Sequence, residues 1–171
     1  MEMNDKKGVS TIVTVVLLIL VAITAVALIA AFVIPFIRNS LNQSEECFAV
    51  LGKVDVVPGQ YTCYSATSNN VSVRINRGFA NDVDVQAIAV VLSGGGQSKR
   101  FDVSSAGSAN VAELGGSFGA ALSLPSEGEE RTYVFNAAGF GAAVTSAQVS
   151  PILSNSKVCD AVTAEIPACS A

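Results

Sequence analysis

The first quarter of the chain is dominated by one unbroken apolar segment. No charged residue occurs in residues 9–37. At 1.5 Å per residue, a helix of these roughly 29 positions would be on the order of 43 Å long, more than the ~30 Å hydrocarbon core of a bilayer. The pattern therefore predicts a long N-terminal helix that is able to span a membrane and to remain in it.

A cleaved secretory signal is the alternative use of such a segment. Its apolar region is only about 7 to 15 residues long, so this run is too long for an ordinary signal. The sequence Ala25-Val26-Ala27 nevertheless resembles the small-residue pattern before a signal cleavage site.

Small residues mark one face of the predicted helix. Thr24, Ala27 and Ala31 follow each other at i, i+3 and i+7. A stripe of this kind lets neighbouring helix backbones approach closely, so we expect it to permit helix packing.

Pro35 interrupts the pattern, because proline lacks an amide hydrogen and crowds the carbonyl group of Ala31. It should kink the helix or end its first section. Beyond it, Ile37, Leu41 and Phe48 are near helical spacing among polar residues, which predicts an amphipathic stem.

After the stem the period of the apolar positions changes from helical to alternating. Val71, Val73 and Ile75 alternate with polar residues, which is typical of a strand with one buried face. Glycine- and proline-containing turns separate the segments, and residues 94–96 are three glycines between two of them. We expect an α+β protein whose second part is an antiparallel, Ig-like β-sandwich of about seven strands. The predicted strands are 54–57, 60–64, 71–76, 83–92, 99–103, 130–137 and 144–153.

The four cysteines all follow the apolar run and form no close pair of the CxxC type. An even number on one side of a membrane segment predicts disulfides in an oxidising compartment, and argues against a zinc site. Four cysteines allow three connectivities. The simplest is the pairing of sequence neighbours, Cys47 with Cys63 and Cys159 with Cys169, because each bond then closes a short loop.

The cysteines also predict the orientation of the chain. Lys6 and Lys7 on one flank of the apolar run and Arg38 on the other do not decide it. Because thiols that pair belong outside the cell, we expect a cytoplasmic N-terminus and an external domain. Two N-x-S sequons, at Asn42 and Asn70, lie on the same side and are candidates for glycosylation.

The composition of the chain argues against nucleic-acid binding and against catalysis. A net charge of −4 with only 10 lysine and arginine residues gives no basic surface for nucleic acid. Histidine is absent, and no nucleophile has an evident base, so we expect no catalytic residues, cofactor or metal, and no enzyme.

Two segments are candidates for a ligand site. A calcium site would use Asn81, Asp82 and Asp84, but these residues lack the spacing of a known calcium-binding loop. The glycines 94–96 are not followed by the Gly-Lys-Ser/Thr sequence that ends a phosphate-binding loop.

The N-terminus carries a more specific pattern. Lys6-Lys7-Gly8 is followed by Val9-Ser10-Thr11-Ile12 and the apolar run. This sequence resembles the start of archaeal type IV pilin precursors, the class III signal peptide family to which archaellins are related. The bacterial branch carries a glutamate at the position of Val13, so its absence favours the archaeal branch.

The resemblance implies that a prepilin peptidase cuts between Gly8 and Val9 on the cytoplasmic side. It divides the chain into a leader (1–8), an apolar helix with its stem (9–46) and an external β-sandwich (47–171). It also implies identical subunits and the pilus assembly machinery as partners, and the membrane as the location before assembly.

The expected function is that of a structural subunit of an extracellular pilus-like filament for surface adhesion. The alternatives are a membrane-anchored pilin-like surface protein, as a minor component or a ligand-binding module, and an archaellin of a motility filament.

Overall fold

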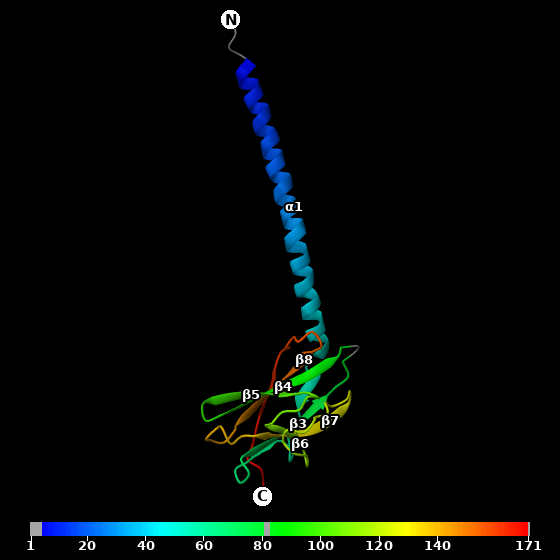
Figure 1. Ribbon diagram of the computed structural model, residues 1–171, viewed down its shortest axis with the longest axis vertical. Helices are drawn as coiled ribbons and strands as arrows, with labels where there is room; N and C mark the ends of the chain where they lie inside the picture. The colour runs from blue at the N-terminus through cyan, green and yellow to red at the C-terminus, as the bar shows by residue number, and fades with distance from the viewer. Residues whose placement is uncertain (1–4, 81–82, 171) are drawn as a thin grey trace. The chain divides into compact units, whose positions relative to one another are not determined.

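A single long helix precedes all the strands. The computed structural model describes the backbone of residues 5–80 and 83–170, and the side chains in these ranges except those of residues 5–11 and 39–44. Helix α1 extends from Asp5 to Val50 (Figure 1). Internal contacts divide the chain into two compact units, Met1–Glu45 and Glu46–Ala171, so the last turn of α1 belongs to the second unit.

Pro35 lies inside α1, and the helix continues through it. Of the two expected effects of Pro35, an end of the first helical section is therefore wrong, and a kink stays a prediction. Proline removes one backbone hydrogen bond, whereas the bonds of the apolar turns on both sides are kept. The apolar face predicted for the stem is also not the buried one. Phe48 is 73% exposed, and the side chain that the last turn of α1 buries is that of Val50. Leu41 lies outside the described side chains.

The second unit consists of two antiparallel sheets. One sheet has the order β1 (Val54–Val56), β3 (Asn70–Arg77), β7 (Glu129–Asn136) and β6 (Val111–Glu113), and β2 (Cys63–Ser65) also pairs with β3. The other has the order β5 (Gln97–Val103), β4 (Val85–Gly94), β8 (Ser146–Leu153) and β9 (Val162–Glu165).

The order of the strands is that of an immunoglobulin-like sandwich. With β2 set aside, the other eight strands become A, B, C, C′, D, E, F and G in chain order. The sheets are then ABED and C′CFG, which is the immunoglobulin arrangement. The predicted fold class, an N-terminal helix followed by an antiparallel sandwich, is confirmed.

The core forms where the inner faces of the two sheets meet. The alternation predicted for residues 71–76 is present, since Val71, Val73 and Ile75 are fully buried. Phe101 of one sheet packs against Phe135 of the other, with ring centroids 5.4 Å apart. Burial of such side chains, at about 1.5–3 kcal/mol each, is the main stabilisation of the domain.

The predicted glycine turn is also present. Gly94 pairs with Gln97 at the end of the β4–β5 hairpin, and Gly95 and Gly96 between them have φ of +58° and +77°. Two successive positive φ values define the hairpin turn that glycine adopts most easily. Residues 94–96 therefore belong to a hairpin and not to a strand-to-helix phosphate loop.

Candidate functional site

The apolar part of α1 is the most distinctive surface of the protein. The segment Ile12–Arg38 has a mean hydropathy of 3.2 and is long and apolar enough to cross a membrane. Every side chain in it is exposed, including eighteen large apolar ones between Ile12 and Ile37. A helix that is apolar on all sides must be covered by lipid or by other protein chains. This segment indicates membrane anchoring or secretion.

A surface groove on α1 coincides only in part with the predicted stripe of small residues, and helix packing through that stripe stays a prediction. A shallow groove along the helix is lined by Ala22, Ile23, Val26, Ala27 and Ala30. Of the predicted packing residues, only Ala27 lines it, whereas Thr24, Ala31 and Pro35 lie outside. Because three of its five lining residues are alanines, a neighbouring helix could approach it closely there.

The Thr24 hydroxyl donates to the carbonyl oxygens of Leu20 and Val21, at 3.0 and 2.9 Å. These bonds satisfy the hydroxyl within its own helix, so Thr24 is compatible with an apolar environment without any partner from another helix.

The predicted cleavage site, Gly8–Val9, lies in the helical backbone of α1, and its side chains are outside the described ones. Cleavage there remains a prediction.

All four cysteines form disulfides, as predicted, but with another connectivity. Cys47 is bonded to Cys159 and Cys63 to Cys169, with Cα atoms 5.3 and 4.9 Å apart. The expected pairs, Cys47 with Cys63 and Cys159 with Cys169, are wrong. The bonds join residues 112 and 106 positions apart, because each cysteine pairs with its neighbour in the folded sandwich and not with its neighbour in sequence. The disulfides indicate an oxidising, extracellular location for the domain.

The Cys47–Cys159 bond joins the last turn of α1 to the loop between β8 and β9. The amide of Cys159 donates to the carbonyl oxygen of Pro151 at 3.0 Å. In the same loop, the Asn155 side-chain amide donates to the Glu46 carboxylate at 2.7 Å. The bond therefore ties Glu46–Val50 to the sandwich. Neither Glu46 nor Asn155 was identified from the sequence, since their contact spans 109 residues.

The two sequons lie in different structural contexts. Asn70 is the half-buried first residue of β3 and pairs with Ser65 of β2 and Asn136 of β7. The side chain of Asn42 lies outside the described ones. Glycosylation of either residue remains a prediction.

An ionic cluster on the ABED sheet has a structural explanation. Arg131 lies 2.8 Å from Glu129 and 3.6 Å from Glu113. A hydrogen bond from the Ser126 amide, helped by Arg131, lowers the pKa of Glu129. Burial raises the pKa of Tyr133, whose hydroxyl donates to the carbonyl oxygen of Ser123. Each of these groups is paired with a neighbour in the fold, which accounts for the cluster without a ligand.

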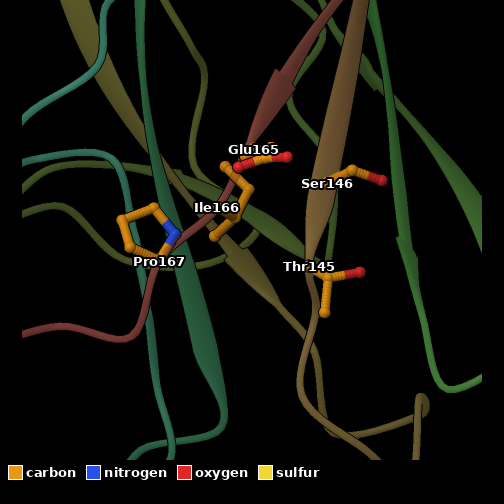
Figure 2. Close-up of a pocket in the computed structure, with 5 residues that line it drawn as sticks. All are labelled: Thr145, Ser146, Glu165, Ile166 and Pro167. Atoms are coloured by element: carbon orange, nitrogen blue, oxygen red, sulfur yellow. The ribbon is translucent and has the colours of Figure 1, made fainter.

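The domain also has an open pocket between the start of β8 and the end of β9. Thr145, Ser146, Glu165, Ile166 and Pro167 line it, as Figure 2 shows. Its polar groups are two hydroxyls and one exposed carboxylate. No group of three or more potential metal ligands occurs among the described residues, and Asn81 and Asp82 of the weighed calcium site lie outside them.

No protein-family model matches the chain, and no curated protein matches it either.

Proposed function

We propose that this chain is a structural subunit of an extracellular, archaeal type IV pilus-like filament that serves surface adhesion. The observation that carries the proposal is the complete exposure of the apolar segment Ile12–Arg38. The sandwich has its own buried core, so this segment is free to contact lipid first and other subunits later. The Lys6-Lys7-Gly8 sequence before the helix supports the same assignment.

In this proposal, α1 has a role in each step from synthesis to assembly of the subunit. The precursor is held in the cell membrane by α1, a prepilin peptidase removes residues 1–8, and the assembly machinery transfers the helix into a bundle of identical helices. Burial of eighteen large apolar side chains is worth tens of kcal/mol relative to water, which opposes dissociation into the medium. Transfer from lipid gains little hydrophobic free energy, so assembly requires machinery.

The sandwich is the external part in this proposal. Its two disulfides and its antiparallel sheets suit a surface-exposed module. The role that we assign to it is structural and adhesive, without enzymatic activity or cofactor.

The second candidate is a membrane-anchored surface protein that never enters a filament. The length and hydropathy of Ile12–Arg38 favour this anchored protein as much as they favour a filament subunit, because a helix of 27 such residues spans a bilayer by itself.

Electron microscopy of cells that produce the full chain beside a functional pilus assembly system distinguishes the two. We expect filaments that contain the chain, and at least tenfold fewer with Val26→Lys, since a lysine at the helix centre costs about 2.5–3.5 kcal/mol. Val26 is 66% exposed in this chain, so the change leaves the sandwich intact.

The matched control is Thr163→Lys, which adds the same charge to an exposed position of β9 and should leave filaments unchanged. A chain that stays in the membrane fraction, with no filament in the presence of the assembly system, contradicts the proposal and supports the anchored protein.

A further inference from the structure

The C-terminal segment crosses from one sheet of the sandwich to the other. Strand β9 pairs with β8, and the Ile166 amide then donates to the carbonyl oxygen of Thr145 at 2.8 Å. Directly afterwards, the Tyr64 amide donates to the Pro167 carbonyl oxygen at 2.8 Å, and the Cys169 amide donates to the Tyr64 carbonyl oxygen at 2.9 Å. The segment therefore continues the edge of the C′CFG sheet and runs parallel to β2 of the other sheet.

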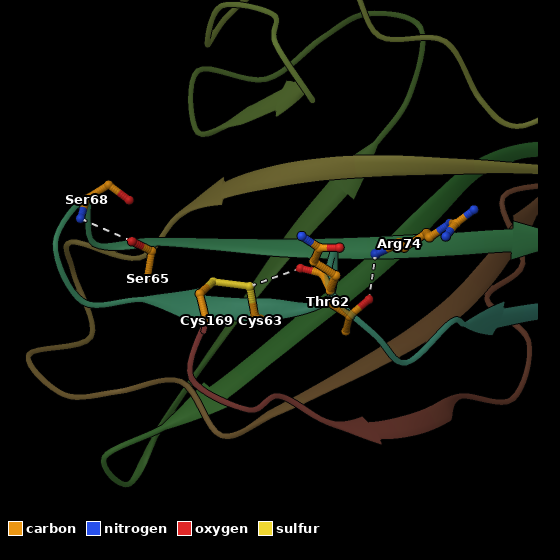
Figure 3. The surroundings of a disulfide bond; sticks show 7 residues. Thr62, Cys63, Ser65, Ser68, Arg74 and Cys169 are labelled. Carbon is orange, nitrogen blue, oxygen red and sulfur yellow. Dashed lines mark hydrogen bonds between the residues drawn. A yellow bond between two sulfur atoms is a disulfide. The ribbon is translucent and has the colours of Figure 1, made fainter. Parts of the chain in front are cut away.

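A disulfide fixes this crossing. Cys169 is bonded to Cys63, the residue before Tyr64 on β2, as Figure 3 shows. Strand β2 itself is held from its other side, because it pairs with β3 and because buried Thr62 donates to the Val57 carbonyl oxygen and accepts from the Arg74 amide. Pro167, Ala168 and Cys169 are exposed, whereas Ile166 is buried.

We propose that residues 166–169 are a latch on the edge of the sandwich, and that the Cys63–Cys169 bond keeps it closed within one molecule. Without the latch, the N–H and C=O groups of Tyr64 are unpaired groups on an edge strand, which readily accept another strand. The strand that fits this edge is already known, since it is the chain's own C-terminal segment. The same segment of a second copy therefore fits the opened edge, and the bond prevents this exchange between copies.

Hydrogen exchange of the full chain in detergent micelles tests whether the bond holds the latch. The test variant is Cys63→Ser with Cys169→Ser, and the matched control is Cys47→Ser with Cys159→Ser. The two bonds close loops of nearly equal length, 106 and 112 residues. Removal of either bond therefore increases the conformational entropy of the unfolded chain by a similar amount. We expect the amides of Tyr64 and residue 169 to exchange at least about tenfold faster in the test variant than in the control. Equal protection in both variants would overturn the proposal.

Mixing two single variants tests the exchange between copies. Cys63→Ser leaves Cys169 free, and Cys169→Ser leaves Cys63 free. With oxidised glutathione, one disulfide forms from the two protein thiols while one glutathione disulfide is reduced to two thiols.

We expect a covalent dimer whose peptide map, from an equimolar mixture, shows Cys63 of one copy joined to Cys169 of the other well above the statistical share, which is about twice each of the Cys63–Cys63 and Cys169–Cys169 dimers. The statistical proportions alone would contradict exchange through the β2 edge. Neither experiment needs a filament, so the outcome is independent of the proposed function.

Discussion

The helix and the sandwich use the same apolar residue types in opposite ways. Between Ile12 and Ile37, valine, leucine, isoleucine and phenylalanine side chains are exposed in every direction. In strand β3 of the sandwich they alternate with polar residues, and Val71, Val73 and Ile75 are fully buried, as is Phe135 of β7. The stability of the sandwich therefore comes from contacts within the chain, whereas the helix depends on its surroundings. A change in one region should consequently leave the other unaffected.

The sharpest test of this comparison replaces one phenylalanine in each region. Phe135→Ala removes a ring that is 0% exposed in the core, and should lower the free energy of unfolding of the sandwich by about 3–5 kcal/mol. Phe36→Ala removes a ring that is 72% exposed on α1, and should leave that free energy unchanged within about 0.5 kcal/mol.

Denaturant unfolding in micelles, followed by tyrosine fluorescence, measures both effects. An equal loss of stability in the two variants would mean that the helix contributes to the core of the sandwich.

The second test concerns the boundary between the two regions. Replacing Cys47 and Cys159 with serine releases the last turn of α1 from the β8–β9 loop, and should destabilise the sandwich by about 2–5 kcal/mol. The shift of the denaturation midpoint relative to the wild-type chain measures it. Unchanged unfolding would show that the last turn of α1 is not a part of the folded domain. Peptide mapping without reduction checks the connectivity itself, and a Cys47–Cys63 peptide would contradict it.

A smaller effect is expected at the β4–β5 hairpin. A Cβ atom on Gly94 would lie 2.2 Å from the carbonyl oxygen of Ala143, so Gly94→Ala forces two backbone segments apart. We expect a loss of about 1–3 kcal/mol in thermal unfolding.

Gly139→Ala is the control, because its Cβ would meet only the mobile end of Lys99, at 3.0 Å. If the two variants melt alike, the close approach at Gly94 does not exist in solution.

The smallest expected effect is a change in pH dependence. The pKa of Glu129 is lowered in the folded protein, mainly by the hydrogen bond from the Ser126 amide. A carboxyl group whose folded pKa is below its unfolded value stabilises the fold above the unfolded pKa, and this contribution is lost as the pH falls through the folded pKa.

Glu129→Gln should therefore reduce stability at neutral pH and flatten its decline below the ordinary glutamate pKa of 4.5. Melting curves from pH 7 to pH 3 measure this, and parallel curves for the two proteins would contradict it.

Local patterns made much of this fold predictable. The helix follows from an uninterrupted apolar run, and β3 follows from strict alternation, because both depend on neighbours in sequence. Strands β6 and β9 were not predicted, since they are only 3 and 4 residues long and lie in segments that looked like connections. The alternation of Val162, Thr163, Ala164 and Glu165 is the signal that would have indicated β9.

The disulfide connectivity was not predictable, because it depends on which loops the sandwich brings together. Cys63 lies on a strand whose neighbour in space is the C-terminal segment, and no sequence pattern near Cys63 or Cys169 encodes that neighbour. The role of α1 is also not predictable from the local sequence pattern. The sequence identifies an apolar helix, whereas what covers it depends on molecules outside the chain.

The most direct test of the filament proposal is intact-mass and N-terminal peptide analysis of the chain in filaments sheared from the cell surface. A chain that begins at Val9, and whose mass is lower by two hydrogens for each of its two disulfides, is the expected result. It would show that the leader is removed and that α1 is kept in the assembled subunit. A full-length chain confined to the membrane fraction would contradict the proposal, and would make Lys6-Lys7-Gly8 a simple topology signal of an anchored surface protein.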